Sequence, residues 1–129
     1  MDPYLVLDVL VSNSTPDISQ PITYKNLYND YLLSHPHPRE DLARYMKKWS
    51  RVYPDGELVI YPEADQQSLD EIHIRRTGPR KLKYIDIIRA FHDVYQRGNL
   101  GHNNLLMNME YQGNGEWVAE MEPEGTLGQ

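Results

Sequence analysis

The C-terminal part of the chain alternates between apolar and polar residues in the manner of a half-buried β-strand. Within residues 116–122 the apolar side chains fall on one face and glutamates on the other. Residues 105–111 alternate in the same way, and the intervening segment 112–115, which contains two glycines, is typical of a hairpin turn. The pattern predicts a β-hairpin that exposes its glutamates and buries Trp117 against a helix predicted over residues 82–97.

Three further segments have the residue pattern of strands. Residues 4–11 are apolar on both faces apart from Asp8, which predicts a strand covered on both sides. Residues 57–61 follow a Pro-Asp-Gly turn, and residues 69–76 alternate so that one face is polar. We expect that outer face to carry Glu71, His73 and Arg75.

Apolar residues at helical spacing predict three helices. The first begins after Thr23, a good helix N-cap, and carries a stripe of tyrosines. In the second we expect Pro38 to occupy the first turn, and the third spans residues 82–97 and ends at Gly98.

Together these segments predict an α+β fold with the order β-α-α-β-β-α-β-β. We expect one two-layer domain over residues 1–122, with a mainly antiparallel sheet and three helices. Residues 123–129 are predicted to form a flexible tail.

Composition narrows the classes of protein to consider. The 129-residue chain has no cysteine, which excludes disulfides, thiolate metal sites and a thiol nucleophile. The N-terminal apolar run is short and lacks a basic flank, so we expect no membrane anchor and a cytoplasmic location.

Charge is distributed unevenly along the chain, whose formal net charge is -6. All of the lysines and arginines lie within residues 25–97, and the last charges, beyond Arg97, are all glutamates. A nucleic-acid-binding protein usually presents a basic field, so the overall balance argues against nucleic acid as the partner and leaves only a local basic patch.

The glutamates of the predicted hairpin form the leading candidate site. Alternation places them on one sheet face, with an asparagine between them in space, so they offer a basic protein an acidic surface. The expected partner-binding residues are Asn108, Glu110, Glu116, Glu120 and Glu122. We therefore expect a protein-binding module, of the inhibitor or immunity type, that neutralises a basic partner such as a nuclease toxin.

A basic segment supports an alternative function in nucleic-acid binding or RNA processing. Residues 75–83 hold five cations and no acid, and His73 is able to carry protons near neutral pH. The candidate phosphate-binding residues are His73, Arg75, Arg76, Arg80, Lys81 and Lys83. A solvated polar face whose opposite charges pair is the simpler interpretation of the same pattern.

No motif indicates an enzyme, a metal site or a cofactor. His35 and His37 are two residues apart, but no third ligand lies near them in the sequence. Phosphate-binding loops and the common catalytic motifs are absent from the sequence. We therefore predict a non-enzymatic protein without metal or cofactor. A structural homodimer that pairs exposed sheet edges is a third hypothesis.

Overall fold

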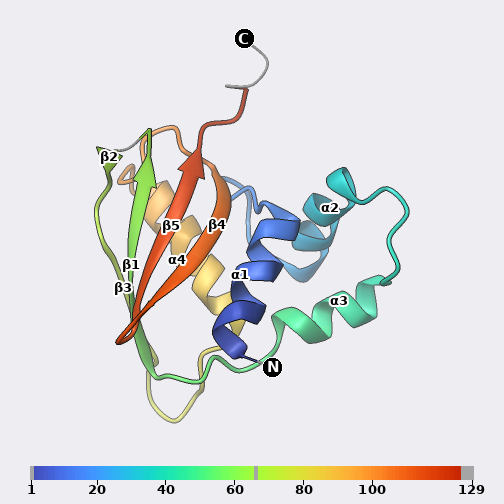
Figure 1. The fold of residues 1–129 in the computed structure, drawn as a ribbon, viewed down its shortest axis with the longest axis horizontal. Coiled ribbons are helices and arrows are strands. Elements are labelled where there is room, and N and C mark those ends of the chain that lie inside the picture. Colours follow the sequence, from blue (N-terminus) through green and yellow to red (C-terminus); the bar gives the residue numbers. More distant parts are fainter. Residues whose placement is uncertain (1, 66, 126–129) are drawn as a thin grey trace.

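The computed structural model describes residues 2–65 and 67–125 as one α+β domain with a mostly antiparallel sheet, which confirms the predicted class. Figure 1 shows the four helices and five strands of these residues. In chain order they are α1 (Pro3–Ser14), α2 (Tyr24–Ser34), α3 (Leu42–Trp49), β1 (Glu57–Ala64), β2 (Gln67–Ser68), β3 (Ile72–Arg75), α4 (Tyr84–Gln96), β4 (Leu105–Gly113) and β5 (Glu116–Glu122).

The centre of the sheet is a parallel pair formed by β1 and β5, with Ile60 opposite Trp117. β4 lies on the far side of β5 and runs antiparallel to it. The other edge of β1 is shared by β3 and β2, which pair antiparallel with its first and last residues, respectively. The strand order is thus β2-β1-β5-β4, with β3 beside β2 on the same edge.

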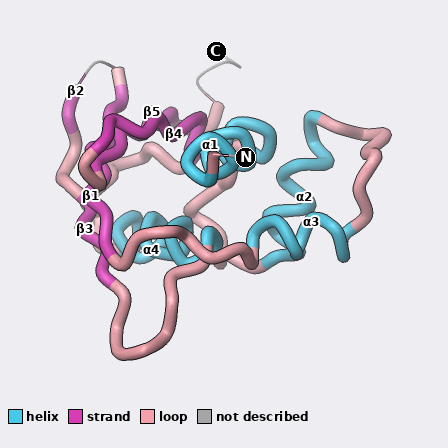
Figure 2. The backbone as a smooth tube through the Cα atoms, turned by 60° about the horizontal axis from the view of Figure 1, so that its bottom comes forward, coloured by secondary structure: helices cyan, strands magenta, loops and turns pink. Residues whose placement is uncertain are grey.

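The helices fall into two groups relative to the sheet. Figure 2 shows α4 on one side of β1 and β5, and no helix of the described residues on the other side. α1 packs against β4, α2 against α1, and α3 against α2, so these three helices extend away from the β4 edge of the sheet. The buried core joins both groups and includes Leu7, Val11, Trp49, Tyr53, Ile60, Ile85, Ile88, Phe91, Met109 and Trp117.

The prediction of a strand over residues 4–11 is wrong, because these residues form most of helix α1. The side chain of Asp2 accepts a hydrogen bond from the backbone N–H of Tyr4 at 2.9 Å, and Pro3 occupies the first turn. A continuous apolar run has no period, so it fits a well-covered helix as readily as a covered strand. Residues 2–65 and 67–125 therefore contain four helices where three were predicted, and the element order begins with three of them.

The other two early helices differ in how well the sequence locates them. α2 begins after Thr23 as predicted, and the Thr23 side chain accepts a hydrogen bond from Asn26 N at 3.0 Å. Pro38, however, lies outside a helix: α3 begins at Leu42 and is capped by Asp41. Asp41 was the stronger start signal, because its carboxylate accepts a backbone N–H of the first turn and a proline ring cannot.

The C-terminal hairpin is confirmed, with one irregularity. Trp117, Ala119 and Met121 are all buried on the inner face. On β4 the alternation is interrupted by a register shift between Leu106 and Asn108, so that Leu106 is buried together with Met109. The extra residue of this bulge moves Leu106 from the expected outer face to the core.

A cluster of aromatic rings joins α1 to the sheet. The ring of Tyr4 stacks on that of Tyr111, with centroids 3.9 Å apart, and its hydroxyl donates to Asp55 at 2.8 Å. The indole N–H of Trp117 donates to the Tyr53 hydroxyl at 2.9 Å. The hydrogen bond to Asp55, together with burial, raises the pKa of Tyr4, and burial raises the pKa of Tyr53 to about 12. Both phenols therefore stay protonated at neutral pH and act as fixed hydrogen-bonding groups.

No helix in residues 2–65 and 67–125 combines the length and the apolar character that a membrane crossing needs. At the C-terminus, the backbone N–H of Glu124 donates to Asn104 Oδ1 at 2.8 Å. Residues 126–129 of the predicted tail lie outside the described residues.

Replacing Trp117 by Ala is expected to lower the free energy of unfolding by about 3–5 kcal/mol, because the indole is fully buried and leaves a cavity. Urea unfolding of the variant and of Glu116→Ala, whose side chain is exposed on the neighbouring position, measures the difference. The assignment of Trp117 to the core would be wrong if the two variants lost similar amounts.

Candidate functional site

The open face of the sheet carries most of the predicted acidic site in a groove of about 570 Å³. Glu110 of β4 and Glu120 of β5 are exposed, whereas Glu122 is half-buried. Asn108 lies beside them, and its Nδ2 donates to Glu120 Oε2 at 2.7 Å. This hydrogen bond holds one carboxylate of the groove in a fixed position.

Two further carboxylates line this acidic groove, and the sequence analysis missed them. Glu63, near the end of β1, is the register partner of Glu120, and Asp65 follows the strand. They reach the groove because β1 pairs with β5 in parallel, so that the C-terminal ends of the two strands meet. Such a pairing between distant segments leaves no local signal in the sequence.

Glu116 does not belong to the acidic groove. It lies at the first residue of β5, opposite Val59, and is exposed. The structure therefore brings together four of the five predicted partner-binding residues and places Glu116 at the other end of the strand.

The carboxylates of the acidic groove have no cationic partner. Among the described residues, none of Glu63, Asp65, Glu110, Glu120 and Glu122 is in an ion pair. Within the same part of the chain, no group of three or more acidic or histidine side chains is arranged to hold a metal ion. The negative charge of the groove is thus available to a partner.

The basic candidates are divided between two places. His73 and Arg75 lie on β3, where His73 Nε2 is 3.0 Å from Glu71 Oε2 and Arg75 makes two hydrogen bonds to Glu57. The remaining cations, Arg76, Arg80, Lys81 and Lys83, lie in the loop that leads into α4 or at the start of that helix.

This loop forms only a small hollow of about 140 Å³, whose lining cations are Arg75, at the end of β3, and Arg76, Arg80 and Lys81 of the loop. Lys83 is the N-cap residue of α4, and its backbone N–H donates to the Asp86 carboxylate at 2.8 Å. His73 is not among the residues of the hollow. The structure thus separates the proton carrier of the alternative hypothesis from most of its phosphate-binding cations.

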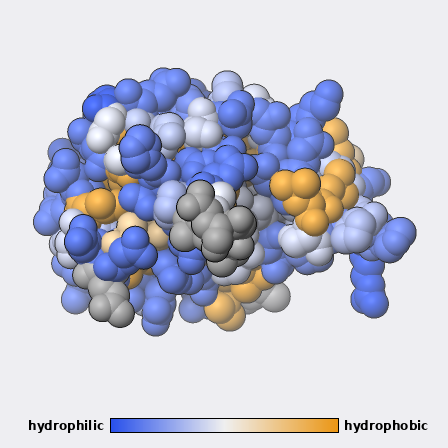
Figure 3. All heavy atoms as spheres, turned by 90° about the horizontal axis from the view of Figure 1, so that it is seen from above, coloured by the Kyte–Doolittle hydropathy of each residue, from blue (hydrophilic) through white to orange (hydrophobic). Residues whose placement is uncertain are grey.

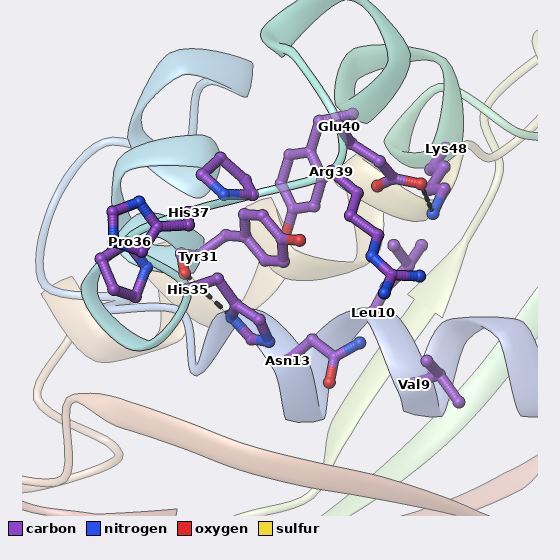
Figure 4. Close-up of a pocket in the computed structure, with 12 residues that line it drawn as sticks. Val9, Leu10, Asn13, Tyr31, His35, Pro36, His37, Arg39, Glu40 and Lys48 are labelled. Carbon is purple, nitrogen blue, oxygen red and sulfur yellow. Dashed lines mark hydrogen bonds and ion pairs between the residues drawn. The ribbon is translucent and has the colours of Figure 1, made fainter.

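A third concave surface, of about 480 Å³, lies between α1, α2, α3 and the loop 35–41 (Figure 4). The His35 ring stacks on Tyr31, with centroids 4.3 Å apart, and its Nδ1 is 3.1 Å from the Tyr31 carbonyl oxygen. Lys48 forms an ion pair with Glu40 at the opposite wall. The sequence analysis missed this helical pocket because one of its walls is α1, which the apolar run presented as a strand.

Stacked aromatic rings form the floor of the helical pocket. Tyr31 stacks on Tyr45, with ring centroids 4.7 Å apart, and the Tyr45 hydroxyl is hydrogen-bonded to Ser14 Oγ. Burial raises the pKa of Tyr45, which keeps this phenol neutral. The packed rings therefore give the helical pocket a rigid floor.

Asp30 is a half-buried carboxyl close to two others. Its Oδ2 accepts the backbone N–H of Asp17 at 3.2 Å, while Asn104 Nδ2 donates to the carboxylates of both Asp17 and Glu124. Burial raises the pKa of Asp30 to about 6, and the charges of Asp17 and Glu124 add to the increase. The hydrogen bond from Asp17 acts in the opposite direction.

Comparisons of the chain with known protein families, with characterised proteins and with solved structures find no match. The function therefore has to be inferred from the geometry and charge of the chain itself.

The raised pKa of Asp30 predicts that the folded chain becomes less stable between about pH 4 and pH 6. In this interval the folded chain retains a proton that the unfolded chain releases, so the free energy of unfolding falls as the pH rises. The variant Asp30→Asn lacks this titrating group, so its stability does not fall in this way. Between pH 4.5 and pH 8, its free energy of unfolding should rise by about 1 kcal/mol relative to that of the wild type, after allowance for the partial exposure of Asp30.

Urea unfolding at the two pH values measures this gain. Asp93→Asn, which changes an exposed aspartate on α4, serves as the control. A relative gain that is equal for both variants would contradict the burial of the Asp30 carboxyl.

Proposed function

We propose that this chain is an acidic protein-binding module, and that its acidic groove binds a basic partner protein. The observation that carries this proposal is the convergence of five carboxylates, from β1 and its following loop, β4 and β5, on one sheet face. Within residues 2–65 and 67–125, no helix covers this face and no lysine or arginine lines the groove. Binding a basic protein requires only this shaped, negatively charged surface.

Electrostatic attraction increases the rate at which such a groove associates with a basic partner and makes it selective. Like charges that converge on one concave surface attract a basic partner over distance and reject an acidic one. Val118 lies in the groove, half-buried between the carboxylates, and supplies apolar contact area at its centre. Asn108 holds Glu120 in place before binding, which lowers the entropy that association costs.

An inhibitor or immunity-type role is the form of this function that we favour. A nuclease is basic around its active site because it has to hold phosphates. A groove lined by five carboxylates and a fixed amide offers similar negative charge to such a surface, so it is suited to cover the site and keep nucleic acid out.

Nucleic-acid binding by the loop 76–81 is the second candidate. Arg76, Arg80 and Lys81 are exposed, and none of the three is in an ion pair within the described part of the chain. The loop lacks an aromatic side chain on which a base could stack, and Arg75 is neutralised by Glu57. These two facts favour the acidic groove.

Reversing the charge of the acidic groove should abolish the capture of basic proteins. We expect the wild-type chain to retain basic proteins from an extract of its native cells, and Glu120→Lys/Glu122→Lys to lose them, since the groove charge then changes by four units. For the purified partner, association with this variant should be about tenfold slower and less dependent on salt.

Arg80→Glu/Lys81→Glu is the matched control, because it also reverses two charges but lies in the basic loop. This variant should still capture the partner. In low salt, it should bind RNA and DNA no more weakly than the wild type does. Loss of capture in this variant, together with normal capture by the Glu120/Glu122 variant, would place the working surface at the loop and not at the groove.

A further inference from the structure

A further concave surface, which is lined by cations and not by carboxylates, lies between α1 and α3. Its volume is about 330 Å³, and it shares Val9, Leu10 and Lys48 with the helical pocket of Figure 4. The two hollows therefore form a continuous surface along α1, which we call the α1 groove. The part between α1 and α3 is lined by Leu5, Val6, Val9, Leu10, Lys48 and Arg51.

The α1 groove exposes aliphatic side chains that have no partner in the described structure. Leu5 is 54 % exposed and Val9 is 48 % exposed, and the two lie one turn apart on the same face of α1. Figure 3 shows that the surface is mostly hydrophilic from above, with hydrophobic atoms gathered in separate patches. Neighbouring exposed aliphatic residues on a concave surface are typical of a docking site.

Cations surround these apolar residues. Lys48 and Arg51 line the part of the α1 groove next to α3, and Arg39 lines the part shown in Figure 4. The guanidinium groups of Arg39 and Arg51 make no ion pair within residues 2–65 and 67–125. Among the described residues, Glu40 alone contributes a carboxylate to the lining of either part, and Lys48 already pairs with it.

We propose that the α1 groove docks an amphipathic segment of a partner protein, with aliphatic side chains that cover Leu5 and Val9 and with carboxylates that pair with Arg51 and Arg39. From Leu5 to Asn13 the groove follows α1 for about 12 Å, which matches about two turns of a docked helix. This docking site goes beyond the proposed function, because it shares no residue with the acidic groove and selects the opposite charge.

Two other occupants fit the observations less well. A second copy that docked the same surface about a two-fold axis would bring Lys48 and Arg51 of both copies together, and like charges would repel. A small molecule is normally enclosed by its pocket, whereas Leu5 and Val9 remain about half-exposed along an open groove.

A library of random 12-residue peptides displayed on phage tests the proposal with the full chain as the immobilised target. We expect the enriched peptides to combine Leu, Ile, Val or Met with Asp or Glu. A synthetic, fluorescently labelled copy of the most enriched peptide then serves as the probe, and fluorescence anisotropy measures its dissociation constant.

Variants of the chain assign the binding surface of this peptide. Val9→Glu and Lys48→Glu/Arg51→Glu should each weaken binding by about tenfold or more, and thermal unfolding verifies that each variant is folded. Arg76→Glu/Arg80→Glu introduces the same charge change at residues that line neither part of the α1 groove, and should leave binding within about twofold of the wild type. Glu120→Lys/Glu122→Lys should also bind the peptide normally, which separates this proposal from the function of the acidic groove.

Several outcomes would overturn the proposal. They are a selection that enriches no peptide, one that enriches basic peptides, or binding that Val9→Glu does not weaken. Sedimentation of the free chain adds one more: a dimer that Val9→Glu dissociates would show that the occupant is a second copy.

Discussion

The architecture depends on the packing of four aromatic rings between α1 and the sheet. Tyr4 stacks on Tyr111 of β4, and Trp117 of β5 is hydrogen-bonded to Tyr53, which precedes β1. Tyr4 also contacts the rings of Tyr53 and Trp117, so one helix residue touches all three partners. Because aromatic rings bury large areas and pack in preferred geometries, this cluster fixes α1 at the edge of the sheet. The position of α1 leaves the outer face of β1 and β5 open and creates one wall of the α1 groove.

Charge is segregated on this frame into surfaces that do not neutralise one another. The acidic groove lies where β1 and β5 end, whereas Lys48 of α3 and the nearby Arg51 line the α1 groove, and the cations of the loop 76–81 follow β3. In the pair of Arg75 with Glu57 both side chains are exposed, so this ion pair stabilises the fold little. The uncompensated groups therefore stand out as the ones available for binding, and their two signs suit two different kinds of partner.

The sequence predicted what short-range patterns determine. Alternation around Trp117 located the last strand and its buried face, and Thr23 located the start of α2. The apolar run at 4–11 has no period that separates helix from strand; the segment is a helix that Asp2 caps and that packs on β4. Glu63 and Asp65 joined the candidate site through a parallel pairing between distant strands, and the bulge that buries Leu106 is set by the partner strand. Contacts of this kind depend on the whole chain, so a local pattern does not contain them.

The parallel pairing of β1 with β5 also has a kinetic consequence. In the sequence, β1 and β5 are separated by the other three described strands and by helix α4. Closing so long a loop costs conformational entropy, and the stabilising contacts between Ile60 and Trp117 form only after the loop has closed. During synthesis on the ribosome, β1 therefore waits with its central edge unpaired until the last strand emerges. The middle of the sheet is consequently the part of this protein that completes its folding late.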